Sequence, residues 1–159
     1  DIFNTYHDAI LLVDKGVKTV SSTAGHNLMN NHPFADKRFQ IAQNNIDKLS
    51  AILKNGDTNE FVKLVEDEAL MLHGLMMTSD PSYILIKSKT LQIIDSIREF
   101  RSKNNIPVCF TLDAGANVHV LFPDRYSDRV YDFIERNLKI HCENNSYIRD
   151  CVGFGAKQL

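Results

Sequence analysis

The feature that most constrains the fold is a pair of extended apolar segments separated by a five-residue turn. Val108–Leu112 is rich in β-branched and aromatic residues, and in Val118–Phe122 apolar residues recur at every second position. Both patterns predict strands. Between them lies Asp113–Asn117, with the sequence DAGAN, whose glycine and small residues predict a tight turn. We therefore expect a central β-hairpin.

Asp113 stands at the end of the first of these strands and has two interpretations. It could project from the strand end toward a ligand and act as a base or an orienting carboxylate. It could instead cap the backbone of its own turn, which is a common role of aspartate in hairpins. The turn considered alone favours the second interpretation, so the first depends on the rest of the chain.

The overall composition is that of a globular domain. The chain has 159 residues, 43% hydrophobic and 24% charged, which is enough to bury a core within one domain. A net charge of −2 provides no attraction for nucleic acid or for an anionic membrane surface. The apolar run Ala9–Val13 is too short to span a bilayer, and the first residues lack the pattern of a signal peptide. We therefore expect no nucleic-acid partner and no membrane partner.

The cysteines and histidines favour neither a disulfide framework nor a metal site. Cys109, Cys142 and Cys151 are odd in number and have no CxxC spacing, as expected of reduced thiols in the cytoplasm. The six histidines show no HExxH or similar ligand spacing. We expect no metal bound by residues of this chain.

The first half of the chain predicts one strand and two helices. The apolar run in Tyr6–Asp14 predicts a strand covered on both faces. A helix is expected to open at Pro33 and to end at Asn55–Gly56. Asp57 and Glu60 resemble a capping box at the start of the second helix. Each helix carries an apolar stripe: Phe39, Ala42, Ile46, Leu49 and Leu53 in the first, and Phe61, Leu64, Val65, Leu72 and Leu75 in the second.

The second half adds a third helix within Tyr83–Lys103, the hairpin, and a short helix capped by Ser127. Edge strands are expected at Ile140 and at Tyr147–Val152. Strands and helices do not alternate strictly. The pattern therefore predicts an α+β fold, with an antiparallel sheet and helices packed on one side.

Two further stretches have open interpretations. The hydroxyl-rich stretch Ser21–Asn27 precedes a helix-compatible segment, where hydroxyls and free N–H groups could hold an anion or could simply cap the helix. His73 lies beside the apolar stripe of the second helix, which favours a buried histidine with its hydrogen bonds satisfied. A substrate contact by His73 stays open, because Gly74 would allow something to approach closely.

Together these motifs resemble a known family. The Ser21–Gly25 stretch and the DAGAN turn occur in this order, with two helices and Leu72–Gly74 between them. This arrangement resembles the C-terminal half of diphosphomevalonate decarboxylases, in the GHMP kinase superfamily. The resemblance runs from about Ala9 to Phe122 and more loosely to Gly155. The DAGAN turn is its specific motif, and the hydroxyl-rich stretch supports it.

The chain departs from the family pattern at a few positions. Ala116 stands where the family usually has proline, and His26 stands where methionine usually follows the glycine. The Thr and Ser usual in the following helix are also replaced, around Asn31–Pro33. These departures bear on the finer identity of the substrate.

The resemblance implies a specific activity. Such enzymes use ATP and Mg²⁺ to convert (R)-5-diphosphomevalonate to isopentenyl diphosphate, releasing ADP, phosphate and CO₂. The equivalent of Asp113 orients or deprotonates the 3-hydroxyl group. The equivalent of Ser22 contacts the substrate, with Thr23 and Ala114 nearby.

The resemblance also implies an organisation for the whole protein. Residues 1–159 would be one domain, the C-terminal, substrate-side half of a two-domain enzyme. The ATP phosphate loop and a catalytic arginine would belong to an N-terminal domain. The chain begins at Asp1 without a methionine, as expected of the later part of a longer protein. The resemblance also implies a cytoplasmic location and leaves a homodimer open.

Three alternatives remain open from the sequence. A related decarboxylase acting on a monophosphate substrate and a GHMP small-molecule kinase would share the fold. A stand-alone α+β ligand-binding module would belong to another functional class. Phosphate-contacting residues outside this chain would separate the enzymes from each other, and the length of the native polypeptide would separate them from a module.

Overall fold

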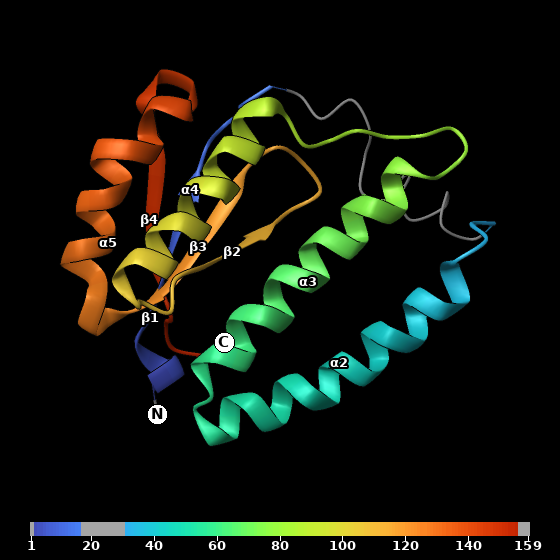
Figure 1. Ribbon diagram of the computed structural model, residues 1–159, viewed down its shortest axis with the longest axis horizontal. Coiled ribbons are helices and arrows are strands. Elements are labelled where there is room, and N and C mark those ends of the chain that lie inside the picture. Colours follow the sequence, from blue (N-terminus) through green and yellow to red (C-terminus); the bar gives the residue numbers. More distant parts are fainter. Residues whose placement is uncertain (1, 17–30, 156–159) are drawn as a thin grey trace, which may run out of the picture.

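The computed structural model describes residues 2–16 and 31–155, and its centre is a four-stranded antiparallel sheet. The strand order is β2-β3-β1-β4, with β1 at Tyr6–Leu11, β2 at Cys109–Leu112, β3 at Val118–Pro123 and β4 at Tyr147–Cys151. The main helices are α2 (Ala35–Asn55), α3 (Thr58–Met77), α4 (Ser88–Asn104) and α5 (Ser127–Phe133), as seen in Figure 1. The predicted α+β class with an antiparallel sheet is confirmed.

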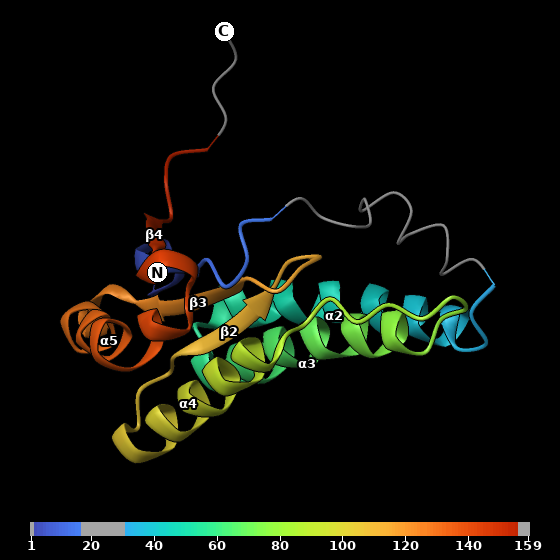
Figure 2. The same cartoon turned by 90° about the horizontal axis from the view of Figure 1, so that it is seen from above.

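One face of the sheet forms the main core. Strand residues that alternate toward this face are buried and pack against apolar residues of α4, of α5 and of the π-helical turn Ile134–Leu138 that continues α5. The strand residues are Ala9, Leu11, Phe110, Val118, Val120 and Phe122. In Figure 2, α4 lies on one side of the sheet, and the C-terminal segment leaves toward the other side.

The opposite face of the sheet is only partly covered. Tyr6 is buried there against Phe61 of α3, but Asp8, Ile10 and His119 farther along the same face are half-buried. The prediction that the first strand is covered on both faces is therefore wrong for most of its length. The continuous apolar run in the sequence conceals this, because Ile10 resembles a core residue although its part of this face is only half-buried.

The helices α2 and α3 form an antiparallel hairpin beside β2 (Figures 1 and 2). The predicted stop at Gly56 is confirmed, since this residue has a left-handed backbone with φ of 71°. Asp57 caps the helix, because its carboxylate accepts hydrogen bonds from the backbone N–H groups of Asn59 and Glu60. The reciprocal half of the predicted capping box is wrong, since the Asp57 N–H donates to the backbone oxygen of Ile52. Helix α2 begins at Ala35, two residues after the predicted start at Pro33.

The apolar stripe predicted for α2 is not a buried face. Phe39, Ile46 and Leu53 are all exposed, because α2 packs against α3 rather than against the sheet. The apolar periodicity predicts that this segment is a helix, but it does not predict which part of the protein packs against its apolar stripe. Leu91 of α4 is exposed in the same way.

Two boundaries in the second half also differ from the predictions. The third helix begins at Ser88, since Tyr83–Lys87 has no regular secondary structure, and it ends at Asn104, followed by a left-handed Asn105. The segment Lys139–His141 is a 3₁₀ helix, so the edge strand expected at Ile140 is wrong, whereas the one at Tyr147–Cys151 is confirmed.

A buried ion pair fixes the helices relative to the hairpin. Glu66 of α3 is buried and accepts two hydrogen bonds from the Arg101 guanidinium of α4, at 2.6 and 3.2 Å. The same guanidinium donates to the backbone oxygen of Val108, at 2.8 Å, just before β2. One arginine therefore joins α3, α4 and the start of the hairpin. Removing one partner of such a buried pair is costly, at about 3–5 kcal/mol.

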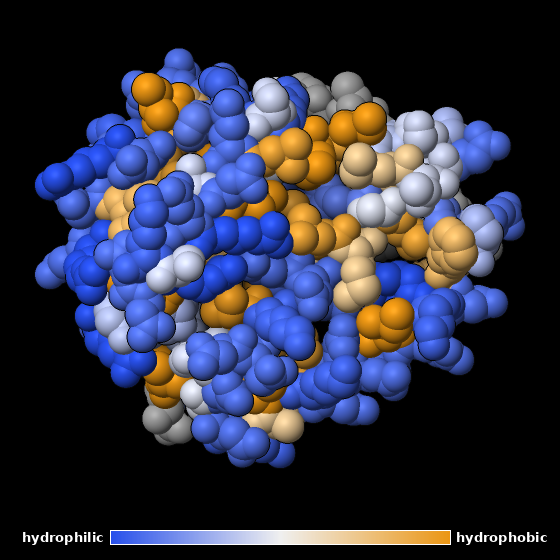
Figure 3. Space-filling model, viewed as in Figure 1, coloured by the Kyte–Doolittle hydropathy of each residue, from blue (hydrophilic) through white to orange (hydrophobic). Residues whose placement is uncertain are grey.

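The surface is mostly hydrophilic on the face shown in Figure 3, with apolar residues gathered over α3 and the chain that leads to α4. Exposed large apolar residues of this part of the chain include Met77 and Ile84. Within residues 2–16 and 31–155, none of the helices has the length and apolar character needed to cross a bilayer.

Candidate active site

The backbone of the DAGAN turn is held at the carbonyl of Asp113. This oxygen accepts a hydrogen bond from the Gly115 backbone N–H at 2.8 Å, which closes the turn. It also lies 3.0 Å from Nε2 of His73, which reaches it from α3. The end of β2 is therefore tied to a neighbouring helix at the residue predicted to be catalytic.

His73 is almost completely enclosed, with 2% of its surface exposed. Burial lowers the pKa of His73 from its ordinary value, and the contact with the Asp113 carbonyl opposes that effect only in part. The imidazole is therefore neutral near pH 7, and it donates its Nε2–H to the carbonyl. This confirms the interpretation of His73 as a buried, satisfied histidine. A Cβ atom added at Gly74 would meet no atom within 4 Å, so the structure shows no group packed closely against the helix at this glycine.

Two more contacts hold the other end of the turn. The Thr90 hydroxyl, fully buried in the first turn of α4, donates to the backbone oxygen of Ala116 at 2.7 Å. The side-chain oxygen of Asn117 accepts from the backbone N–H of Asp14 at 3.1 Å, just beyond β1. The turn is thus fixed to α3, α4 and the segment after β1, three elements that come from distant parts of the sequence.

A side chain at position 115 would press on the Asp113 carboxylate, although the Gly115 backbone itself is not left-handed. A Cβ atom added at this position would lie 2.9 Å from Oδ1 of Asp113, closer than real Cβ atoms approach an oxygen. The Asp113 carboxylate therefore folds back over the glycine. This contact explains why a glycine occupies the third position of the turn.

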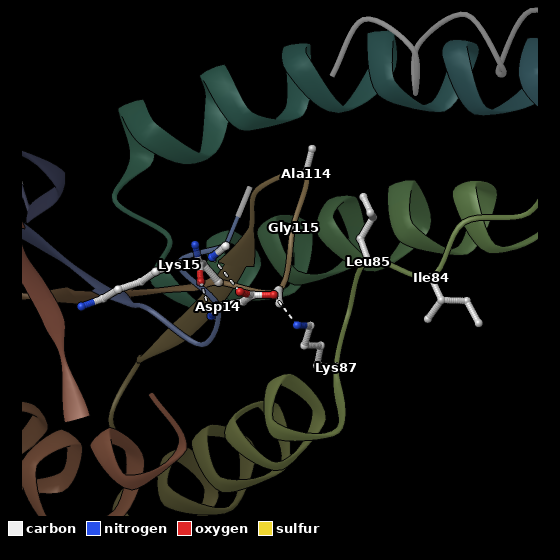
Figure 4. Close-up of a pocket in the computed structure, with 10 residues that line it drawn as sticks. Asp14, Lys15, Ile84, Leu85, Lys87, Ala114 and Gly115 are labelled. Carbon is white, nitrogen blue, oxygen red and sulfur yellow. Dashed lines mark hydrogen bonds and ion pairs between the residues drawn. The ribbon is translucent and has the colours of Figure 1, made fainter. Parts of the chain in front are cut away.

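A pocket of about 350 Å³ opens beside the turn. Its lining includes the turn residues Ala114 to Asn117, the Asp14–Gly16 segment, and Ile84, Leu85 and Lys87 before α4. Figure 4 shows Lys87 directed at the Asp14 carboxylate, with which it forms an ion pair, whereas Lys15 points away. The ion pair with Lys87 holds the pKa of Asp14 below its ordinary value. Ala114, predicted to contact substrate, thus faces a space large enough for a small molecule.

The other predicted substrate contacts cannot be placed beside this pocket. Ser22 and Thr23 lie outside the described residues, as do the remaining residues of the hydroxyl-rich stretch. Asp113 and Ala114 lie on the turn as predicted. The sequence does not predict that Thr90 and Asn117 hold the turn in place. Asn117 belongs to the DAGAN motif, but nothing in the pattern of α4 distinguishes Thr90 from an ordinary residue of the first helical turn.

The described part of the chain has no metal centre of its own. Within it, no three His, Cys, Asp or Glu residues come close enough together to bind a metal ion. A Mg²⁺ ion held with a nucleotide takes most of its ligands from phosphate and water and only one or two carboxylates from protein. This arrangement is compatible with a metal delivered with a nucleotide.

Comparison with known proteins identifies the family. Residues 9–155 match the family model described as the mevalonate 5-diphosphate decarboxylase C-terminal domain. The phosphomevalonate decarboxylase of Haloferax volcanii is 27% identical over 89 residues, which cover 56% of this chain and 28% of that protein.

Solved structures share the fold. Mevalonate pyrophosphate decarboxylase from Streptococcus pyogenes superposes with a TM-score of 0.86 at 19% identity, covering 99% of this chain and 48% of that one. A mevalonate diphosphate decarboxylase from Legionella pneumophila gives a TM-score of 0.81 at 24% identity, covering 89% of this chain and 45% of that one. The chain thus spans about half the length of these solved relatives. It belongs to the family of mevalonate 5-diphosphate decarboxylase C-terminal domains.

Proposed function

We propose that this chain is the substrate-side half of a two-domain, ATP-dependent decarboxylase. The reaction converts (R)-5-diphosphomevalonate to isopentenyl diphosphate and releases ADP, phosphate and CO₂. The family match supports this proposal, as does the fact that the chain spans about half of its solved relatives. The N-terminal half would then carry the ATP phosphate loop, and the whole enzyme would act in the cytoplasm; a homodimer stays open.

The observation that carries the proposal is the way the DAGAN turn is held. Three elements fix its backbone through His73, Thr90 and Asn117, and a pocket opens beside it. A plain hairpin turn needs no such anchoring, whereas a catalytic carboxylate gains from a fixed position.

The chemistry gives Asp113 a role. A tertiary alcohol is a weak acid, so a carboxylate beside the 3-hydroxyl can orient it or remove its proton while the γ-phosphoryl group of ATP is transferred. Phosphate then leaves with the electron pair of its C–O bond. The bond to the carboxylate carbon breaks, its electron pair forms the C=C bond, and CO₂ is released. Ser22, Thr23 and Ala114 are proposed to contact the substrate.

ATP and Mg²⁺ are the proposed cofactors. A structure described as MDDEF in complex with MVAPP, AMPPCP and magnesium shares this fold, with a TM-score of 0.80 at 24% identity. Bound ATP with Mg²⁺ supplies the phosphoryl group. In this chain, Asp113 would hold or accept the hydroxyl proton.

The test replaces Asp113 in the full-length enzyme. Asp113→Asn keeps the size and hydrogen-bonding reach of the side chain but removes the negative charge and the base. We expect normal folding and normal binding of ATP and substrate, with kcat lowered by about 10²–10⁴-fold, as for the loss of a positioned acid–base group. Asp132→Asn is the control, because Asp132 is an exposed residue of α5 paired with Arg136.

The opposite result would support a structural role for Asp113. In that case Asp113→Asn would melt at a lower temperature, and the fraction that stays folded would keep the parental kcat. Thermal melting and steady-state kinetics on one preparation separate the two outcomes.

A monophosphate substrate is the second candidate. The relative from Haloferax volcanii is a phosphomevalonate decarboxylase, and the chain departs from the usual diphosphate pattern at Ala116. Turnover of 5-phosphomevalonate and 5-diphosphomevalonate by the full-length enzyme, compared as kcat/KM, decides between the two. A protein that phosphorylates either compound without releasing CO₂ would be a GHMP small-molecule kinase instead.

A further inference from the structure

A second ionisable pair lies on the partly open face of the sheet. Nδ1 of His119 on β3 is 2.8 Å from Oδ2 of Asp8 on β1. The side chains are 25% and 30% exposed, so the pair is accessible from the side that α4 and α5 do not cover. Nothing in the proposed mechanism uses it.

The contact with Asp8 fixes how the His119 ring is used. Oδ1 of Asp8 is buried and has no hydrogen-bond partner among the residues that the structure describes, whereas Oδ2 contacts His119. A second carboxylate, Asp150 of β4, is paired with Asp8 in the sheet register. The imidazole donates Nδ1–H to Asp8, and in the protonated ring Nε2–H is then the group that can donate to a ligand. The hydrogen bond with Asp8 raises the pKa of His119, and the charges of Asp8 and Asp113 add to that effect against the opposing effect of burial.

The sheet register brings this pair toward Asp113. His119 is opposite Thr111 of β2, and Asp113 follows directly after the last residue of β2, Leu112, which is paired with Val118. Asp113 and His119 therefore lie at the same end of the β2–β3 hairpin, where one small molecule could contact both. The charge of Asp113 acts on the pKa of His119, which is consistent with the same proximity.

We propose that His119, oriented by Asp8, binds an anionic oxygen of the substrate through Nε2–H, beside Asp113. The inference rests on the proposed function, because it places the substrate hydroxyl at Asp113. Mevalonate phosphates carry a carboxylate and phosphoryl oxygens on either side of that hydroxyl carbon, so an anion necessarily lies near it. A cation on this face balances that charge and keeps the hydroxyl directed at Asp113.

The first experiment is steady-state kinetics of the full-length enzyme. His119→Gln removes the positive charge and should raise KM for the substrate by about tenfold to a hundredfold, the size of a lost hydrogen bond to a charged group. KM for ATP should stay unchanged. A larger loss with 5-diphosphomevalonate than with 5-phosphomevalonate assigns the contact to the terminal phosphoryl group, and an equal loss with both assigns it to a group that the two share, the carboxylate or the inner phosphoryl group.

The pH dependence provides a readout that a purely structural role would not change. If protonated His119 binds the substrate, kcat/KM falls as the pH rises through the pKa of His119. Asp8→Asn removes the group that raises this pKa, so the decline should move to lower pH. In His119→Gln the decline should be absent.

His7 provides a matched control. It also pairs with a carboxylate at 2.8 Å, Asp124, and its side chain is 21% exposed. Its ring, however, stacks on Phe122, on the opposite face of the sheet. His7→Gln should leave KM and the pH profile unchanged.

An NMR titration tests the contact without turnover. In the full-length enzyme without ATP, added 5-diphosphomevalonate should raise the pKa of His119 and leave the ring resonances of His7 unchanged. An enzyme that turns over its substrate with unchanged KM and pH profile in His119→Gln overturns this inference alone. A full-length protein that decarboxylates neither mevalonate phosphate overturns the proposed function instead.

Discussion

Replacing Gly115 by alanine tests whether the position of the Asp113 carboxylate matters for catalysis. The added methyl carbon would lie 2.9 Å from Oδ1 of Asp113, whereas ordinary contacts of this kind begin near 3.4 Å. The carboxylate must therefore retreat by about half an ångström. Since a displacement of about 1 Å in an active site can cost about 10²-fold in rate, we expect kcat of the full-length enzyme to fall by about tenfold.

The same substitution should change stability very little. The backbone of Gly115 does not adopt a left-handed conformation, so alanine is tolerated there. Alanine also restricts the unfolded chain, which stabilises a protein by about 0.4–1 kcal/mol and offsets the close contact. Urea unfolding of the same preparation should therefore give a free energy of unfolding within about 1 kcal/mol of the parent.

Gly74→Ala is the matched control. Gly74 lies in α3, and a Cβ atom there would meet nothing within 4 Å. Alanine in a helix interior should stabilise the protein by about 0.5–1 kcal/mol and leave kcat unchanged. A Gly115→Ala enzyme with the parental kcat would refute the reasoning, because the displaced carboxylate would then have no part in the rate.

Three further predictions concern two contacts that hold the turn and the isolated chain. Thr90→Val keeps the shape of the side chain but removes the donor to the Ala116 carbonyl. It should lower the free energy of unfolding in urea by about 1–3 kcal/mol, more than Thr90→Ser does. A Ser variant less stable than the Val variant would contradict this. Burial lowers the pKa of His73, so its contribution to stability is complete at pH 7 and is lost as the pH falls below about 6.5, the pKa of an unfolded histidine. The loss of unfolding free energy between pH 7 and 5.5 should therefore be smaller in His73→Gln than in the parent, and an equal loss would contradict the assignment. The isolated chain of residues 1–159 should unfold cooperatively but release no ADP from ATP, and substrate-dependent ADP release would show that it holds a nucleotide site.

The elements that local patterns specify were predictable. Gly56 and Asn105 end their helices with a left-handed backbone, and Asp57 caps α3, because each effect depends only on neighbouring residues. The hairpin follows from alternation and a turn. The start of α2 was two residues off, since proline at position 33 is compatible with the helix but does not require it.

What covers an element was not predictable from periodicity. The stripe of α2 has the spacing of a buried face, yet Phe39 and Ile46 are exposed, because tertiary packing places α2 outside α3. In β1 the apolar run suggested two covered faces, yet Ile10 is only half-buried. Hydrophobic spacing identifies a face but not its partner.

The candidate site was predictable in part for the same reason. The DAGAN motif identifies Asp113 and Ala114, but Thr90 contributes through a contact that joins residues 26 positions apart. The pairing of His119 with Asp8, 111 positions apart, depends on the register of β1 and β3. A single sequence contains no record of such register, so these residues appear only when the strands are placed.

The anchors also explain why the decisive substitution should leave the fold intact. His73 and Gly115 both bind the backbone oxygen of Asp113, and Thr90 binds that of Ala116. None of these contacts uses the carboxylate of Asp113, so Asp113→Asn keeps all three. The backbone of the turn is therefore stabilised independently of the charge that it presents. A protein that needed Asp113 only to form its hairpin would have no reason to hold the same carbonyl from a separate helix, and this is the strongest structural argument that the carboxylate serves the reaction.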